Sequence, residues 1–150
     1  MTQLAAGARE AIGDLNARFA WALDLHDFDA LRGILTPDVH YVAVGREFHD
    51  AEAVIASFFA RAPARTTRHG LGNLLLESLD DETVSGRSSW HTFASNEDPP
   101  LAGVHLFMVA DFSDVYRRTP GGWRIAERII TPVFRDPTLA PAEAAPPHPS

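Results

Sequence analysis

The spacing of apolar residues predicts a helix over residues 8–24. Within this stretch the large apolar side chains recur at steps of three and four, which places them on one face of a helix. These residues are Ile12, Leu15, Phe19 and Leu23. Trp21 lies off this stripe, so the helix is expected to be covered on two sides.

Two shorter helices are expected before residue 63. Asp27 can cap the first of them and Asp50 the second, because a carboxylate at the N-cap accepts a bond from the first turn. The sequence Thr36-Pro37-Asp38 ends the first, since proline disfavours continued helix. A strand is expected over residues 39–44, and Gly45 and Arg46 are expected to form a turn.

The remainder of the chain is strand-like. Residues 66–79, 83–94, 104–118 and 123–134 are rich in β-branched and aromatic residues and are separated by turn-forming sequences. Helices gathered before long antiparallel strands predict an α+β fold, with three N-terminal helices packed on one face of a strongly curved sheet. Such a sheet leaves a concave interior suited to a small molecule.

The domain organisation follows from the same pattern. Residues 1–135 are expected to form one domain. Residues 136–150 are rich in proline and alanine, so they are expected to form a tail that is poorly ordered or lies across a neighbouring subunit. Such a tail should add little to stability.

The bulk composition excludes several classes of function. The chain has 150 residues and a net charge of −7, and its basic residues are scattered, which argues against nucleic-acid binding. It contains no cysteine, which excludes thiolate catalysis and disulfides. No signal peptide and no membrane span are expected, so a cytoplasmic location follows by default.

Three stretches resemble the SnoaL-like proteins of the nuclear transport factor 2 and ketosteroid isomerase superfamily. They are IGDLNARFAWALDLHDFDALRGILTPDVHY near the start, TTRHGLGN in the middle and YRRTPGGWRIAERIITPVF near the end. Their order and spacing span residues 12–134. The resemblance implies the cone-shaped α+β fold of that superfamily, with a ligand pocket inside the cone.

Within that superfamily the chain is most similar to the scytalone dehydratase and hexachlorocyclohexane dehydrochlorinase branch. The resemblance implies a catalytic aspartate–histidine pair at Asp24 and His69, and an active-site arginine at Arg128. This sequence departs from the dehydrochlorinase pattern at Phe19, because the dehydrochlorinase has a lysine at that position, which helps the halide leave. This departure argues against halide elimination and favours a different leaving group, a ring closure or an isomerisation.

The residue chemistry agrees with a dyad but also allows a simpler interpretation. An imidazole can take a proton near neutral pH, and a buried carboxylate beside it would fix its tautomer. Asp24 and His69 both lie in otherwise apolar segments. The alternative is that Asp24 ends its helix in solvent or bonds to the turn that follows.

Arg128 also has two interpretations. Strict alternation places it on one strand face with Arg124, Ala126 and Ile130, and the sequence does not say whether that face is internal. An inward arginine could stabilise negative charge on a substrate. An outward one would pair with an acid such as Asp114 across the strands.

Other residues are candidates for lining the pocket. His91 and His105 lie within predicted strands, whereas His26, His40 and His49 lie at turns or element edges and are expected to be solvated. No metal site is expected, because no histidine pair has the i,i+4 helical spacing of a zinc motif. The full set of predicted substrate-binding residues is Phe19, Trp21, Tyr41, Phe58, Asn73, Trp90, His91, His105 and Phe107.

These observations favour a cofactor-independent lyase that acts on a small, apolar and cyclic molecule. His69 would remove a proton from carbon, Asp24 would orient it, and Arg128 would stabilise the developing charge. A polyketide or terpenoid cyclase and an isomerase remain alternatives, as does a non-catalytic domain that binds a ligand or serves assembly. The resemblance implies a homo-oligomer, either a trimer or a dimer, with no nucleic-acid or membrane partner.

Overall fold

Six strands form one curved sheet in the computed structural model, which describes residues 3–144. The helical elements are α1 (Ala8–Asp24), η1 (Phe28–Gly33), α2 (Ala51–Phe59) and η2 (Pro137–Leu139). The strands are β1 (Leu35–Ala43), β2 (Arg46–Phe48), β3 (Thr66–Ser78), β4 (Thr83–Ser95), β5 (Leu106–Thr119) and β6 (Gly122–Arg135). Their order is β2-β1-β6-β5-β4-β3, and every pairing is antiparallel except β1 with β6.

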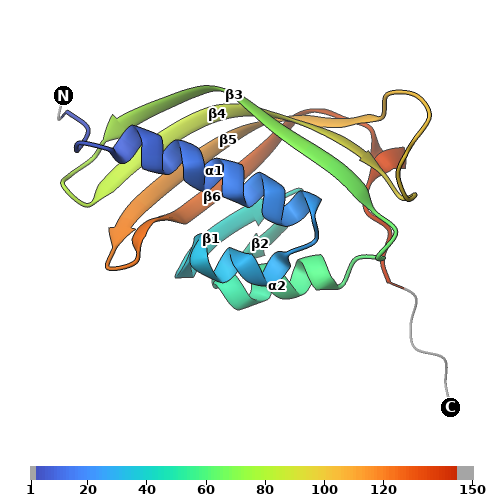
Figure 1. Cartoon of the computed structure of the whole chain (residues 1–150), viewed down its shortest axis with the longest axis horizontal. Helices are drawn as coiled ribbons and strands as arrows, with labels where there is room; N and C mark the ends of the chain where they lie inside the picture. Colours follow the sequence, from blue (N-terminus) through green and yellow to red (C-terminus); the bar gives the residue numbers. More distant parts are fainter. Residues whose placement is uncertain (1–2, 145–150) are drawn as a thin grey trace, which may run out of the picture.

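The helices cover the concave side of the sheet. The long strands β3–β6 arch over α1, while η1 and α2 pack near the short β1–β2 hairpin (Figure 1). The α+β fold with three N-terminal helices on a curved, mainly antiparallel sheet is therefore confirmed. Its cone encloses the space in which the candidate site lies.

The apolar stripe of α1 faces the sheet as predicted. Ile12 and Phe19 are almost completely buried. The prediction that Trp21 is covered as well is wrong, because its side chain is 55% exposed. Only one face of α1 meets the sheet, and Trp21 lies outside that face under the guanidinium of Arg68, whose Cζ is 5.6 Å from the centroid of the indole ring system.

The first strand starts earlier than its sequence suggests. Proline at position 37 was expected to precede the strand, yet β1 begins at Leu35 and includes it. The three-residue strand β2 begins at Arg46, where a turn was expected. Its sequence is too short to show the alternation of apolar and polar residues that predicts a strand. The cap at Asp50 is confirmed, since Ala53 N donates to Asp50 Oδ1 at 2.7 Å.

A bulge in β6 changes which of its side chains face inward. Tyr116 pairs with Ile125 and Val115 pairs with Glu127, so Ala126 is the extra residue. Ile125 and Arg128 are consequently both buried, although strict alternation places them on opposite faces. The alternation predicted for this strand is therefore broken at Ala126.

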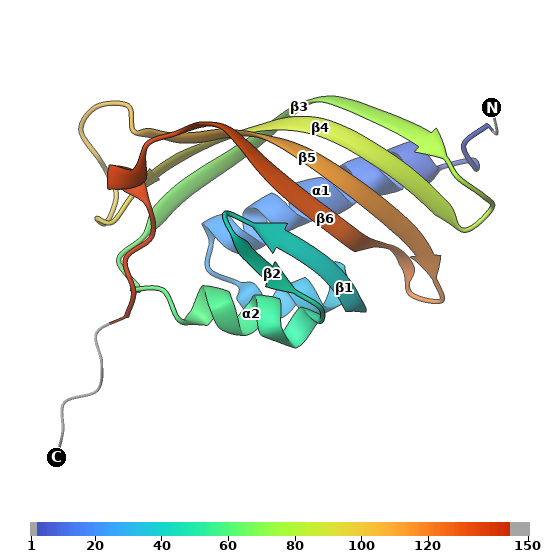
Figure 2. The same cartoon turned by 180° about the vertical axis from the view of Figure 1, so that it is seen from behind.

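Residues 136–144, called the C-terminal strap below, run from the end of β6 toward the segment that precedes β3 (Figure 2). Main-chain bonds fix the strap there: Ala62 N donates to Ala142 O at 2.8 Å, and Ala144 N donates to Ala60 O at 3.0 Å. At its start, Asp136 N donates to a β5 carbonyl at 2.8 Å.

The expectation of a poorly ordered tail is therefore wrong for residues 136–144. Composition alone suggested disorder, but the strap is held by main-chain groups, which any residue except proline can supply in full. Side chains add to this: Arg65 Nη1 donates to Leu139 O at 2.6 Å, and Asn96 Nδ2 donates to Ala140 O at 2.9 Å. Residues 145–150 lie outside the described part of the chain.

Removing the strap should lower stability. A chain that ends at Arg135 loses these hydrogen bonds, each worth about 0.5–1.5 kcal/mol before the ordering entropy is subtracted. The melting temperature should fall by roughly 3–8 °C, as measured by calorimetry. A chain that ends at Ala144 keeps all of the strap's hydrogen bonds named above and is the control. Equal melting temperatures for the two chains would show that the strap stabilises nothing.

Candidate active site

Asp24 and His69 are in direct contact. Asp24 is the last residue of α1 and His69 is the fourth residue of β3, where α1 crosses that strand. His69 Nδ1 lies 2.6 Å from Asp24 Oδ1. Because a carboxylate only accepts, Nδ1 carries the proton in this contact, and in the neutral form of the imidazole the lone pair is then on Nε2. No hydrogen bond to Nε2 is found within residues 3–144.

Two further bonds fix the carboxylate of Asp24. Thr67 Oγ1 donates to Oδ1 at 2.8 Å, and His69 N donates to Oδ2 at 3.0 Å. The side chain of Asp24 is only 3% exposed, so it does not end the helix in solvent. Since all three donors belong to β3, the end of α1 and this strand hold the imidazole in one orientation.

His69 faces two adjoining cavities. The larger has a volume of about 640 Å³ and the smaller about 220 Å³. Both are lined by Leu23, Phe58, Arg61, Arg65, Thr67 and His69. The larger cavity also reaches Met108, Phe112 and Ile130 from the sheet and residues 140–144 of the strap. Its size suits a small cyclic molecule, and the strap forms part of its wall.

Arginines bring positive charge to these cavities: Arg46, Arg61, Arg65 and Arg135 line the larger one, and Arg61 and Arg65 line both. Burial lowers the pKa of Arg61. Burial, and to a smaller extent repulsion from Arg61, lowers the pKa of Arg65 to about 10. Both side chains therefore remain protonated near neutral pH. Neither forms an ion pair with a carboxylate in residues 3–144. Arg65 Nε is buried and has no hydrogen-bond partner among the described residues.

Four of the predicted pocket residues line the larger cavity. They are Phe19, Tyr41, Phe58 and Phe107. Burial raises the pKa of the Tyr41 phenol, so this group stays neutral. These rings give the cavity flat apolar walls.

Five of the predicted pocket residues lie elsewhere. Trp90 is buried behind the cavity wall, stacked on Phe112 with ring centroids 4.6 Å apart. Trp21 lies on the outer side of α1. Asn73 is exposed where the β3–β4 register shifts and has a φ of 55°. His91 is exposed on the outer face of β4, and His105 Nε2 bonds to Ala102 O in the loop before β5.

Arg128 points inward but does not line either cavity. Its guanidinium is completely buried and forms a paired contact with Asp114, with Nε to Oδ1 and Nη2 to Oδ2 both 2.9 Å. Burial alone would lower its pKa, but Asp114 outweighs that effect and raises it. Nη2 also donates to Asn16, and Tyr116 donates to Asp114 Oδ2 at 2.7 Å.

Aromatic rings separate Arg128 from the cavities. Its Cζ lies 4.5 Å from the ring centroid of Phe19, 4.9 Å from that of Phe112 and 5.3 Å from that of Trp90. The predicted pairing with Asp114 therefore occurs, but in the core and not on the surface. This arrangement does not support direct contact between Arg128 and a substrate.

The sequence did carry a signal for the two arginines that line both cavities. Arg61 and Arg65 stand in the segment that leads into β3, within eight residues of His69. They form no run of basic residues, so a scan for such runs treats them as scattered. Thr67 was also missed, although it lies two residues before His69 and so shares its face of the strand.

The fold and the site define a cone-shaped α+β protein with an internal ligand cavity. The chain belongs to the SnoaL-like domain family, whose model matches residues 5–129. A comparison with curated protein sequences gives no match. In the part of the chain that the structure describes, no helix is both long and apolar enough to cross a membrane.

Solved structures agree with this fold. Rv3472 from Mycobacterium tuberculosis, described as a protein of unknown function, is 25% identical, with a TM-score of 0.75 over 88% of this chain and 76% of that one. LinA is 23% identical, with a TM-score of 0.73 over 94% and 95% of the two chains. A putative scytalone dehydratase from Novosphingobium aromaticivorans is 12% identical, with a TM-score of 0.72 over 91% of each chain.

Proposed function

We propose that this protein is a cofactor-independent lyase that eliminates water from a small cyclic substrate. The observation that carries this proposal is the contact between Asp24 and His69 at the wall of an internal cavity. It leaves one imidazole nitrogen unprotonated and directed away from the carboxylate, as a general base requires. The likeness to a putative scytalone dehydratase gives further support.

The reaction follows from this geometry. His69 Nε2 takes a proton from a substrate carbon, and the electrons of that C–H bond form a carbon–carbon double bond. The hydroxyl on the adjacent carbon departs with its bonding electrons and leaves as water once it has accepted the proton that His69 Nε2 took from carbon. Asp24 stabilises the imidazolium in the meantime and holds its ring in place.

Arg61 and Arg65 take the role that the sequence first suggested for Arg128. A proton on carbon becomes acidic when an adjacent carbonyl oxygen can accept the negative charge as an enolate. Guanidinium groups without a carboxylate partner favour such an oxygen, particularly where aromatic walls exclude water. The substrate class we propose is therefore a ring compound that carries both a hydroxyl group and an anionic or carbonyl oxygen.

The experiment is a screen with matched pairs of cyclic compounds that carry or lack a carboxylate, such as 1-hydroxy-2-naphthoate and 1-naphthol for binding. Hydroxylated cyclic ketones are the corresponding compounds for dehydration. The wild-type protein should bind the anionic partner at least about tenfold more tightly, which corresponds to about 1.4 kcal/mol. It should also dehydrate hydroxyketones, or exchange their α-hydrogen with solvent deuterium.

A pair of arginine variants tests the assignment of charge. Arg61→Gln should remove most of the preference for the anionic partner. Arg68→Gln is the control, because Arg68 lies in the same segment but is exposed and stacks on Trp21 outside the cavity. The proposal fails if no compound is dehydrated and none exchanges its α-hydrogen. It also fails if Arg61→Gln and Arg68→Gln change the preference for the anionic partner equally.

A cyclase or an isomerase is the alternative, because each begins with the same proton abstraction. Deuterium exchange without loss of water would favour it. A non-catalytic binding domain would show ligand binding without exchange. The Asp24–His69 contact counts against that last class, since ligand binding without catalysis does not require it.

A further inference from the structure

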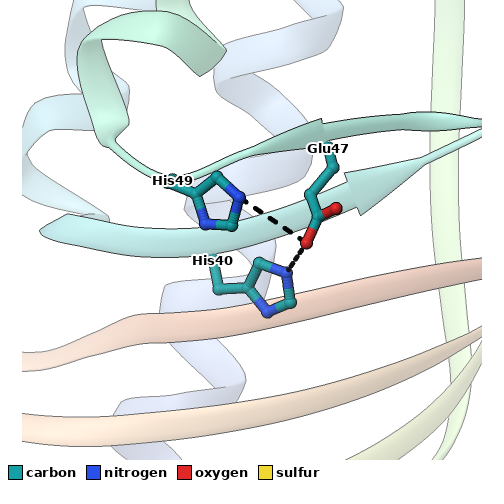
Figure 3. Close-up of side chains that lie close together, drawn as sticks. All are labelled: His40, Glu47 and His49. Atoms are coloured by element: carbon teal, nitrogen blue, oxygen red, sulfur yellow. Dashed lines mark hydrogen bonds and ion pairs between the residues drawn. The ribbon is translucent and has the colours of Figure 1, made fainter.

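A second cluster of chemically reactive side chains lies on the β1–β2 hairpin. His40 belongs to β1, Glu47 to β2, and His49 follows β2 directly. Figure 3 shows both imidazoles turned toward the same carboxylate. His40 Nε2 lies 2.7 Å from Glu47 Oε1, and His49 Nε2 lies 3.6 Å from that oxygen. The rings are stacked, with an interplanar angle of 7°.

The arrangement has the dimensions of a metal-binding site. One potential ligand atom from each of the three residues lies within 4.8 Å of the other two. Two imidazole nitrogens and one carboxylate oxygen are ligands that suit Zn²⁺, and a fourth position would remain for water. The side chain of His49 is 74% exposed, so an ion can enter from solvent.

Glu127 supplies an independent observation that points to a metal. It lies on β6 in register with His40, and its Oε2 is 2.9 Å from His40 Nδ1. A metal-binding histidine commonly donates its other ring N–H to a carboxylate, which fixes the tautomer and directs the free nitrogen to the ion. Here Glu127 directs Nε2 of His40 toward Glu47 and His49.

We propose that His40, Glu47 and His49 bind one Zn²⁺ ion on this hairpin, with Glu127 positioning His40. The i,i+4 spacing of helical zinc motifs does not reveal this site, because His40 and Glu47 come from two paired strands and His49 follows the second. The neighbouring hairpin residues Tyr41 and Phe48 line the larger cavity. A bound ion would join β1 to the segment after β2 and so steady this part of the cavity wall.

The experiment is a calorimetric titration of the untagged full-length chain, stripped of metal, with Zn²⁺. We expect saturable binding of one ion per chain. His49→Ala should weaken it at least tenfold, and Glu127→Gln should weaken it by about 10–100-fold without changing the stoichiometry. His91→Ala is the matched control, because His91 is an exposed histidine outside the cluster, and it should bind as the wild type does.

Several results would overturn the proposal. One is the absence of saturable binding at one ion per chain. Another is equal affinity for the wild type and His49→Ala, which would assign the ion to other groups. His49 is mainly exposed, so this variant keeps the fold even if His40→Ala does not. An unchanged affinity for Glu127→Gln would remove the positioning role of Glu127.

Discussion

Replacement of His69 by alanine is expected to lower kcat by about 10²–10⁴-fold, the usual contribution of a positioned proton-transfer group. The reason is that His69 lines the cavity while its Nδ1 is bound to Asp24, so that Nε2 of the neutral imidazole is the nitrogen able to accept a proton. Turnover of a compound identified by the screen, measured under saturating conditions, gives this value.

Asp24→Asn tests whether the two residues act as a unit. The amide keeps the shape of the side chain, but it can present an N–H to Nδ1 and so favour the wrong tautomer. We expect a large fall in kcat with little change in KM, and a double variant with His69→Ala no worse than the poorer single variant. His91→Ala is the control and should keep most of the activity. An active His69→Ala protein would mean that another group is the base.

Loss of the carboxylate at Asp114 should cost the protein about 3–5 kcal/mol of unfolding free energy, because Asp114→Asn leaves the guanidinium of Arg128 buried without its counter-charge. Both side chains of this pair are completely buried. Urea denaturation of the two proteins measures the difference.

An exposed pair in the same sheet is the matched control. Arg117 Nη2 lies 2.6 Å from Asp38 Oδ1, but their side chains are 40% and 70% exposed. Arg117→Gln should therefore change the unfolding free energy by about 1 kcal/mol or less. Combining Asp114→Asn with Arg128→Met should recover part of the loss, since no unpaired charge then remains. A cost below about 1 kcal/mol for Asp114→Asn would contradict a structural role for this pair.

The parts predicted correctly from the sequence depend on local periodicity. Helix α1 follows from its apolar stripe, and Asp24 is recognisable because a carboxylate interrupts that stripe at the helix end. The long strands follow from their β-branched and aromatic composition. The Asp24–His69 contact joins residues 45 apart, and it was reached through the family resemblance together with these local patterns.

The parts that were missed depend on long-range packing. Whether Arg128 reaches the cavity is decided by the bulge at Ala126 and by the aromatic rings around its guanidinium, and neither has a local signature. The strap was missed for another reason, since its composition is typical of disorder while its main chain finds partners in the segment before β3. The pairing of β1 with β2 likewise brings His40, Glu47 and His49 together, so no spacing along the sequence reveals that cluster.

The way the strap is held has a consequence for how this pocket can diversify. Its bonds to Ala60 and Ala62 use main-chain atoms, so the side chains of its cavity-lining residues carry none of that attachment. Substitutions at Ala140 or Ala142 can therefore reshape the cavity without releasing the segment that forms its wall. Selection for a larger or smaller ligand can act there while the base and its carboxylate stay untouched. For the proposed lyase, substrate preference is thus separable from catalysis, and the strap is the place to randomise when a new preference is sought.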